Sequence, residues 1–185
     1  MAMQRTVLAS LLPLAILAAG LTGAAHADER RCDGTLSGDH DNIAVRTGGT
    51  CNLQGVRTSG SVVVARGGSL SMSGSRIGGN VQAEGARAIT IDGGSIDGSV
   101  QLRQGNSARI SNAAIEGDLQ LDDHRASVVA TSNRVAGNLQ VKDNRGGVTL
   151  RNNVMDGNLQ CEGNVPAPAG GANRAASRQG QCSGL

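Results

Sequence analysis

Aromatic residues are absent, because the 185-residue chain contains no phenylalanine, tyrosine or tryptophan. Aromatic rings are the surfaces on which nucleic-acid bases stack and the common anchors of binding hot spots, and they offer broad apolar faces to sugar rings. Without them, we expect any binding face of this protein to be polar or aliphatic.

An excess of either charge is also absent. The chain has 17 Lys and Arg residues against 15 Asp and Glu residues. Removal of residues 1–27, interpreted below as a signal peptide, takes away Arg5 and no acid, which leaves a net charge of about +1. Nucleic-acid binding needs clustered basic residues that displace counterions. We therefore expect no nucleic-acid partner.

The only long apolar stretch lies near the amino terminus. Arg5 precedes an apolar run over residues 7–21, and a small-residue cleavage site ends the range 1–27. This order is typical of a secretory signal peptide. A membrane anchor needs about twenty unbroken apolar residues, whereas this run is shorter and contains Ser10 and Pro13. The sequence thus predicts an exported protein, periplasmic or secreted, without a transmembrane anchor in the mature chain.

Four cysteines suit an exported chain, because disulfides persist in oxidising compartments. Cys32 and Cys51 lie near the start of the mature chain, and Cys161 and Cys182 lie near its end. Pairs at opposite ends of an elongated fold are too far apart to bridge. We therefore expect the bonds Cys32–Cys51 and Cys161–Cys182. A zinc site is the weaker alternative, because no close Cys or His pairs occur.

A short motif recurs about every twenty residues: Gly, then Asn, Asp or Ser, then Val or Leu, and usually Gln. The steps between successive motif glycines are 19, 19, 19, 20 and 20 residues. Periods of this length indicate a solenoid. The motif glycines are Gly60, Gly79, Gly98, Gly117, Gly137 and Gly157.

Each repeat also contains two stretches in which apolar residues alternate with polar ones. Val81 and Ala83 form one such pair, and Ile89 and Ile91 form the next. Alternation with period two predicts strands with one buried face. A third, shorter segment is expected to bury one apolar residue per repeat: Val56, Ile77, Ile96, Ile115, Val135 and Met155. Glycines at the corners are expected to supply positive φ angles.

These patterns predict an all-β fold, a right-handed parallel β-helix, which is a single-stranded solenoid. About six to seven coils of 19–20 residues are expected over residues 42–164. A left-handed β-helix built on hexapeptides would keep a strict coil of three hexapeptides, which this spacing exceeds. Residues 28–41 and 165–185 are expected to be an N-terminal cap and a C-terminal cap or tail, each tied by a disulfide, with the tail interpreted as a loop.

Two columns of outward side chains follow from the repeat. The fifth position of successive coils alternates in sign, and we interpret it mainly as a ladder that fixes register. A column of glutamines is interpreted in the same way, as an amide ladder along the stack. The first column reads Glu84, Arg103, Asp122, Lys142 and Glu162, and the second reads Gln82, Gln101, Gln120, Gln140 and Gln160.

The densest acidic cluster contains Asp122, Asp123 and Asp143. Like charges this close are unfavourable unless a cation or a proton is shared. Carboxylates and loop carbonyls could hold Ca²⁺, or a carboxylate pair could perform acid–base chemistry on a polysaccharide. The structural alternative is a solvated corner neutralised by Arg125 and Arg145. Apart from this Ca²⁺ hypothesis, the sequence predicts no cofactor.

Several protein groups share features of this sequence. The Gly-Asn/Asp-Val/Leu step resembles bactofilins, the cytoplasmic polymer-forming cytoskeletal proteins, although a signal peptide and disulfides depart from that family. The coil pattern is similar to pectate-lyase-like β-helices, whose aromatic residues and catalytic arrangements are not found here. The segments 157–164, 166–171 and 180–182, which begin with Gly-Asn-Leu-Gln-Cys and end with Gly-Gln-Cys, resemble the C-terminal signature of uncharacterised exported bacterial β-solenoid proteins. That likeness implies a fold and a compartment, but no site residues.

The sequence therefore predicts an exported, non-enzymatic β-solenoid with a structural or surface-interaction role in the cell envelope. Its expected partners are further copies of itself or an envelope glycan. A Ca²⁺- or polysaccharide-binding module is the alternative. An enzyme acting on polysaccharide has the least support, because nothing assembles an acid, a base and a sugar platform.

Overall fold

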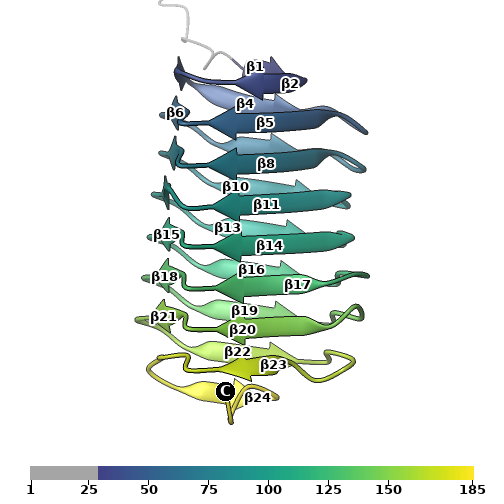
Figure 1. Cartoon of the computed structure of the whole chain (residues 1–185), viewed down its shortest axis with the longest axis vertical. Helices are drawn as coiled ribbons and strands as arrows, with labels where there is room; N and C mark the ends of the chain where they lie inside the picture. Colours follow the sequence, from purple (N-terminus) through teal and green to yellow (C-terminus); the bar gives the residue numbers. More distant parts are fainter. Residues whose placement is uncertain (1–28) are drawn as a thin grey trace, which may run out of the picture.

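The computed structural model describes residues 29–185 and shows a parallel β-solenoid of about eight turns (Figure 1). The predicted signal peptide lies outside the described residues. Strands of three parallel sheets follow one another in every full turn. In Figure 1 the near strands β5, β8 and β11 run to the left and the strands behind them run to the right as the chain descends, so the coil is right-handed. Within residues 29–185, no helix is long and apolar enough to span a membrane.

The three sheets have nine, eight and seven strands. Sheet A contains β1 (Glu29–Cys32), β4 (Asn42–Val45), β7 (Val62–Val64), β10 (Val81–Glu84), β13 (Val100–Arg103), β16 (Leu119–Asp122), β19 (Leu139–Lys142), β22 (Leu159–Glu162) and β24 (Arg178–Gly180). Sheet B contains β2 (Gly34–Leu36), β5 (Thr50–Gln54), β8 (Ser69–Ser73), β11 (Ala88–Asp92), β14 (Ser107–Ser111), β17 (Val128–Thr131), β20 (Val148–Arg151) and β23 (Ala169–Gly171). Sheet C contains β3 (Asp39–His40), β6 (Arg57–Thr58), β9 (Arg76–Ile77), β12 (Ser95–Ile96), β15 (Ala114–Ile115), β18 (Arg134–Val135) and β21 (Val154–Met155).

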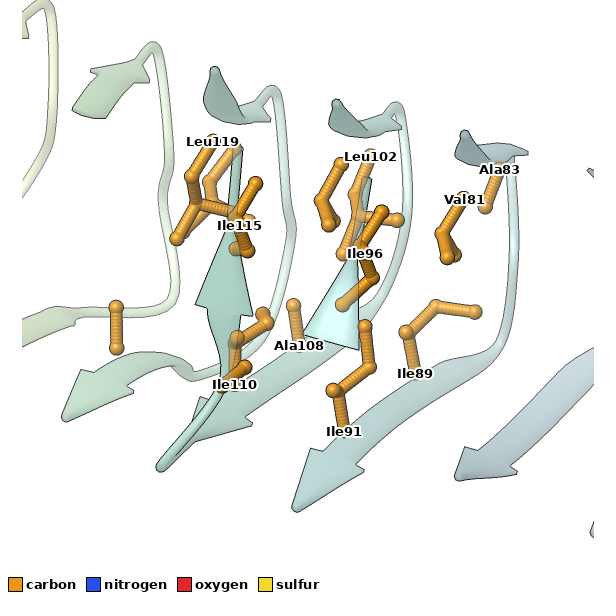
Figure 2. Packing of buried hydrophobic residues seen from close by; sticks show 14 of the residues in the cluster. Val81, Ala83, Ile89, Ile91, Ile96, Leu102, Ala108, Ile110, Ile115 and Leu119 are labelled. Atoms are coloured by element: carbon orange, nitrogen blue, oxygen red, sulfur yellow. The ribbon is translucent and has the colours of Figure 1, made fainter. Parts of the chain in front are cut away.

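The core is a thin aliphatic column enclosed by the three sheets. Val81 from sheet A, Ile91 from sheet B and Ile96 from sheet C are each 0% exposed, and Figure 2 shows such side chains converging on one interior. Because identical positions stack in register from coil to coil, each buried side chain packs against its counterparts above and below. Complete burial of one aliphatic side chain contributes about 1.5–3 kcal/mol. The predicted alternation in sheets A and B is confirmed.

The third segment differs from the prediction in its first repeat. Thr58, not Val56, pairs in register with Ile77. Val56 is also buried, but it lies at the preceding turn, where its backbone N–H donates to Ser75 Oγ at 3.1 Å. The β-branched Thr58 fits the inward position because its hydroxyl donates to the carbonyl of Asp41. The apolar pattern alone could not reveal this shift.

The solenoid extends into both predicted caps. Residues 29–40 contain β1, β2 and β3, and the tail contributes β23 and β24. The interpretation of the tail as a loop was wrong. Glycine in the tail allows it to approach the preceding coil closely. A Cβ atom at Gly170 would collide with the carbonyl oxygen of Leu150 in the coil above. A Gly-rich segment can therefore add a strand that bulkier residues would push away.

Both predicted disulfides are present. Cys32–Cys51 joins the first two coils with a Cα–Cα distance of 5.5 Å, and Cys161–Cys182 joins the last two with a distance of 5.3 Å. These separations are typical of disulfides. One covalent bond thus closes each end of the described solenoid.

Candidate interaction surfaces

The recurring Gly-Asn/Asp/Ser motif builds a hydrogen-bonded ladder at the corner between sheets C and A. Asn80 Oδ1 accepts the backbone N–H of Ser99 at 2.8 Å, and Ser99 Oγ accepts that of Asp118 at 3.0 Å. The same contact recurs between the backbone N–H groups of residues 61, 80, 138 and 158 and the side chains of residues 42, 61, 118 and 138. The motif therefore satisfies partly buried backbone donors, which is a structural task.

The motif glycines are required by space and not by positive φ. A Cβ atom at Gly98 would lie 2.5 Å from Asn80 Oδ1 and 2.7 Å from the carbonyl oxygen of Gly79. None of the six motif glycines has a positive φ, so the expectation that corner glycines supply one was wrong for them. It is confirmed at the Gly-Gly corners, by Gly48, Gly67, Gly93, Gly94 and Gly147. The sequence shows that glycine recurs at the motif position. The reason that glycine is needed there is the close approach of neighbouring coils, which the sequence does not reveal.

Two further ladders of buried asparagine were missed by the sequence analysis. Asn153 is 0% exposed. Its Oδ1 accepts the backbone N–H of Asn133 at 3.1 Å, and its Nδ2 donates to the carbonyl of Ala130 at 2.9 Å. Asn144 and Asn164 repeat this arrangement at the turn between sheets A and B. Asparagine recurring every twenty residues is the signal that could have revealed these ladders.

His124 begins the second ladder and is 1% exposed. Its backbone N–H donates to Asn144 Oδ1 at 2.9 Å, and its Nδ1 lies 3.2 Å from the same atom. The ring fits because Gly105 lies directly against it, where a Cβ atom would be 2.9 Å from Nε2. Burial lowers the pKa of His124, and the hydrogen bond to Asn144 only partly opposes this effect.

The outer face of sheet A carries the predicted charge column, with successive members in register. Arg103 Nε lies 3.9 Å from Asp122 Oδ2, and Arg66 Nη2 lies 3.9 Å from Glu84 Oε1. Asp33 and Arg46 form a separate ion pair in the first two coils, and Ala65 interrupts the column between Arg46 and Glu84. Opposite charges on this face thus neutralise one another.

The neighbouring glutamines also stack in register, from Gln82 to Gln160. Among the described residues, however, no hydrogen bond joins two of these glutamines. Arg103 Nη2 instead donates to Gln120 Oε1 at 3.1 Å. The predicted amide ladder therefore forms from the buried asparagines and not from the outward glutamines.

The three residues of the acidic cluster divide between two environments. Asp122 belongs to the charge column, whereas Asp123 and Asp143 are exposed on consecutive coils at a turn with φ angles of 55° and 54°. Burial raises the pKa of Asp122, and the charges of Arg103 and Lys142 oppose this rise. Within residues 29–185, no three His, Cys, Asp or Glu side chains form a group suited to a metal ion. The Ca²⁺ site at Asp122, Asp123 and Asp143 stays a prediction.

The outer face of sheet B is composed mainly of small hydroxyl side chains and arginines. Arg109 projects from β14 and, with Thr90, Ser107 and Ser127, lines a hollow of about 190 Å³. Arg87 lies across the hydroxyls of the preceding coils, since its Nε donates to Ser69 Oγ at 3.0 Å. Apart from Asp92 at the end of β11, the outward positions of these strands carry no carboxylate.

The two ends of the core carry arginines. Arg30 pairs in register with Ile43, and Arg178 pairs in register with Leu159. Both arginines therefore share the register of a sheet A column that is buried and apolar in every coil between them, and both are exposed at the ends of that column. At the carboxyl terminus, Cys182 is 0% exposed and Leu185 packs against the core. Polar or covalently fixed groups thus close both ends of the described chain.

Comparisons of this sequence and structure with protein families, curated proteins and solved structures find no match. The resemblance to exported bacterial β-solenoid proteins therefore stays a prediction, and the functional argument depends on the chain itself.

Proposed function

We propose that this protein is an exported, non-enzymatic β-solenoid that acts through its lateral faces as a surface-interaction module of the cell envelope. The observation that carries the proposal is that each end has one disulfide and one exposed arginine in the register of the core column. Disulfides favour an oxidising compartment. Residues 1–27 support the same compartment because they have the composition of a signal peptide.

The closed ends favour a role for the lateral faces over end-to-end polymerisation. If the C-terminal end of one copy stacked on the N-terminal end of another, Arg178 and Arg30 would meet at the core column. Arg178 Nη1 donates to the carbonyl oxygen of Leu185, but no acid would face the two guanidinium groups. Burying two like charges in this way costs several kcal/mol. Charged side chains on an edge strand are a known protection of exposed sheet edges. The lateral faces, in contrast, repeat regular side-chain patterns over the whole length.

Light scattering on the oxidised mature chain, starting at residue 28, tests the role of the faces. We expect a monomer over a wide concentration range. A mass that grows with concentration would overturn this part of the proposal and favour a polymeric scaffold. Export is tested separately by fusing residues 1–27 to a reporter enzyme that is active only after disulfide formation, and an inactive fusion would argue against export.

A Ca²⁺- or polysaccharide-binding module is the second candidate. It is favoured by one observation, since Oδ1 of Asp122 is buried and has no hydrogen-bond partner among the described residues. Thermal unfolding with Ca²⁺ and with a chelator tests it on the wild-type chain and on the Asp123→Asn, Asp143→Asn double variant. If neither Ca²⁺ nor the chelator changes the melting temperature of the wild-type chain or of the double variant, the Ca²⁺ site is excluded.

A further inference from the structure

Arginines are exposed along one side of the solenoid, on sheet B and on the turn that leads into it. Arg46 and Arg66 on this turn lie in ion pairs with Asp33 and Glu84, and five others do not. They are Arg87, Arg109, Arg125, Arg145 and Arg151, and we call them the arginine face. Within residues 29–185, none of the five has a carboxylate oxygen within 4.0 Å. Sheet A differs, because its cations alternate with acids along a single column.

The acids on the same side do not balance the arginine face. Asp92 lies at the end of β11, where Asn112 Nδ2 donates to its Oδ1 at 3.0 Å. Asp123 and Asp143 lie in the turn from sheet A to sheet B, beside Arg125 and Arg145. Five arginines against these three aspartates leave a net charge of +2 on this side, although the mature chain as a whole is nearly neutral.

Arg125 and Arg145 provide a more local indication. They follow the buried ladder residues His124 and Asn144 on consecutive coils, and the backbone N–H of Arg145 donates to the carbonyl of His124 at 2.8 Å. Equivalent positions on neighbouring coils lie about 4.8 Å apart. Like charges at this spacing are unfavourable in the free protein. Asp123 and Asp143 lie at the same turn but form no ion pair with either arginine, so an anion bound by both guanidinium groups would reduce that repulsion.

The hydroxyl groups beside the arginines indicate what kind of anion the face suits. Thr90 and Ser107 adjoin Arg109 in the hollow on sheet B, and Thr149 lies one strand position from Leu150 on the outward side of β20. Guanidinium groups bind carboxylates, while serine and threonine hydroxyls both donate to and accept from sugar hydroxyls. A chain of acidic sugars presents both groups in a regular repeat, as the coils of the solenoid do.

We propose that the arginine face binds an anionic polysaccharide of the cell envelope, with Arg109 and Arg151 holding successive acidic groups along the stack. They lie two coils apart, on β14 and β20, and Arg125 and Arg145 extend the contact at the adjoining turn. This proposal rests on the proposed function, because it requires an exported protein whose faces are free. The ligand is defined by its chemistry, a polymer of sugars that carry carboxylates.

Binding of polygalacturonate to the oxidised mature chain, measured by titration calorimetry, tests the proposal. We expect binding that weakens as salt is raised, because salt screens exposed charges, and no binding of neutral dextran. The variant Arg109→Gln with Arg151→Gln should bind at least about tenfold more weakly, a difference of about 1.4 kcal/mol. The control Arg103→Gln with Lys142→Gln removes the same charge from sheet A, where both residues lie in strands, and should bind within about twofold of wild type.

Three results would overturn the proposal. They are no binding of polygalacturonate by the wild-type chain, equal losses in the two double variants, and tighter binding of anionic phospholipid vesicles than of polygalacturonate. Thermal unfolding verifies that each variant is folded. The failure of this proposal is distinguishable from failure of the proposed function, because an exported monomer that ignores polygalacturonate contradicts only the former.

Discussion

Arg30 and Arg178 occupy the two ends of a single core column. The positions between them, from Ile43 to Leu159, are all buried and apolar. A repeat protein exposes apolar core and unpaired strand edges wherever its repeats stop. Here the column stops in a cation at each end. On the proposed function, these cations keep the solenoid from continuing into a polymer.

Replacing both arginines should therefore open the ends. In the variant Arg30→Val with Arg178→Val, we expect the mass measured by light scattering to rise with concentration, because the apolar column can then continue into a second copy. The control is Arg31→Val with Arg178 retained, since Arg31 lies in the same strand but faces outward, in register with Ala44. A double variant that stays monomeric would show that the arginines are not what keeps the ends apart.

The buried asparagines should be among the least replaceable polar residues. Asn153→Ala removes the acceptor of the Asn133 backbone N–H and the donor to the Ala130 carbonyl. Each buried group left unpaired costs about 1–3 kcal/mol, so for these two groups we expect a loss of about 2–6 kcal/mol in the free energy of unfolding. Urea unfolding measures this loss. The outward Gln140→Ala should change stability by less than about 0.5 kcal/mol, and comparable losses for both would contradict the ladder's importance.

The repeat, the strand order, the alternation and both disulfides could be predicted from sequence, because apolar periodicity and cysteine position report directly on which side chains face inward. The hydrogen-bonded ladders could not be predicted. In the sequence, Asn80 and Asn153 are both polar residues at turns, and only the spacing of the coils shows which backbone groups their side chains reach. The tail failed for a related reason. Its Gly170 looks like a loop residue, whereas its missing side chain permits strand pairing with β20.

The buried His124 should make stability depend on pH. The pKa of His124 is lowered in the folded state. As pH falls below about 6.5, the histidine therefore binds a proton in the unfolded chain before it does so in the folded protein, and the free energy of unfolding decreases. We expect the melting temperature to fall from pH 7 towards pH 5. In His124→Asn this pH dependence should weaken, because the asparagine side chain does not titrate and can continue the ladder of Asn144. Thermal unfolding across this range decides, and an unchanged slope in the variant would assign the pH dependence elsewhere.

The Cys161–Cys182 bond should stabilise the last coils. It closes a segment with a sequence separation of 21 residues, and a loop of this size contributes about 3 kcal/mol by restricting the unfolded chain. Cys161→Ser with Cys182→Ser should lower the free energy of unfolding by about 2–4 kcal/mol. Hydrogen exchange should show the added opening in β23 and β24, while β10 and β11 stay protected. Uniform exchange along the solenoid would indicate that the bond stabilises the whole fold and not its end.

Ionisation of the partly buried Asp122 side chain should lower the stability of the folded protein at neutral pH. Burial raises its pKa, so the folded state favours the protonated form, and this contribution disappears as pH rises through the raised pKa. Asp122→Asn keeps the shape without the charge. We expect the variant to melt at a higher temperature than wild type at pH 7, and the difference to vanish near pH 3, where both side chains are neutral. A variant less stable than wild type at pH 7 would show that attraction to Arg103 and Lys142 outweighs the cost of burying the carboxylate.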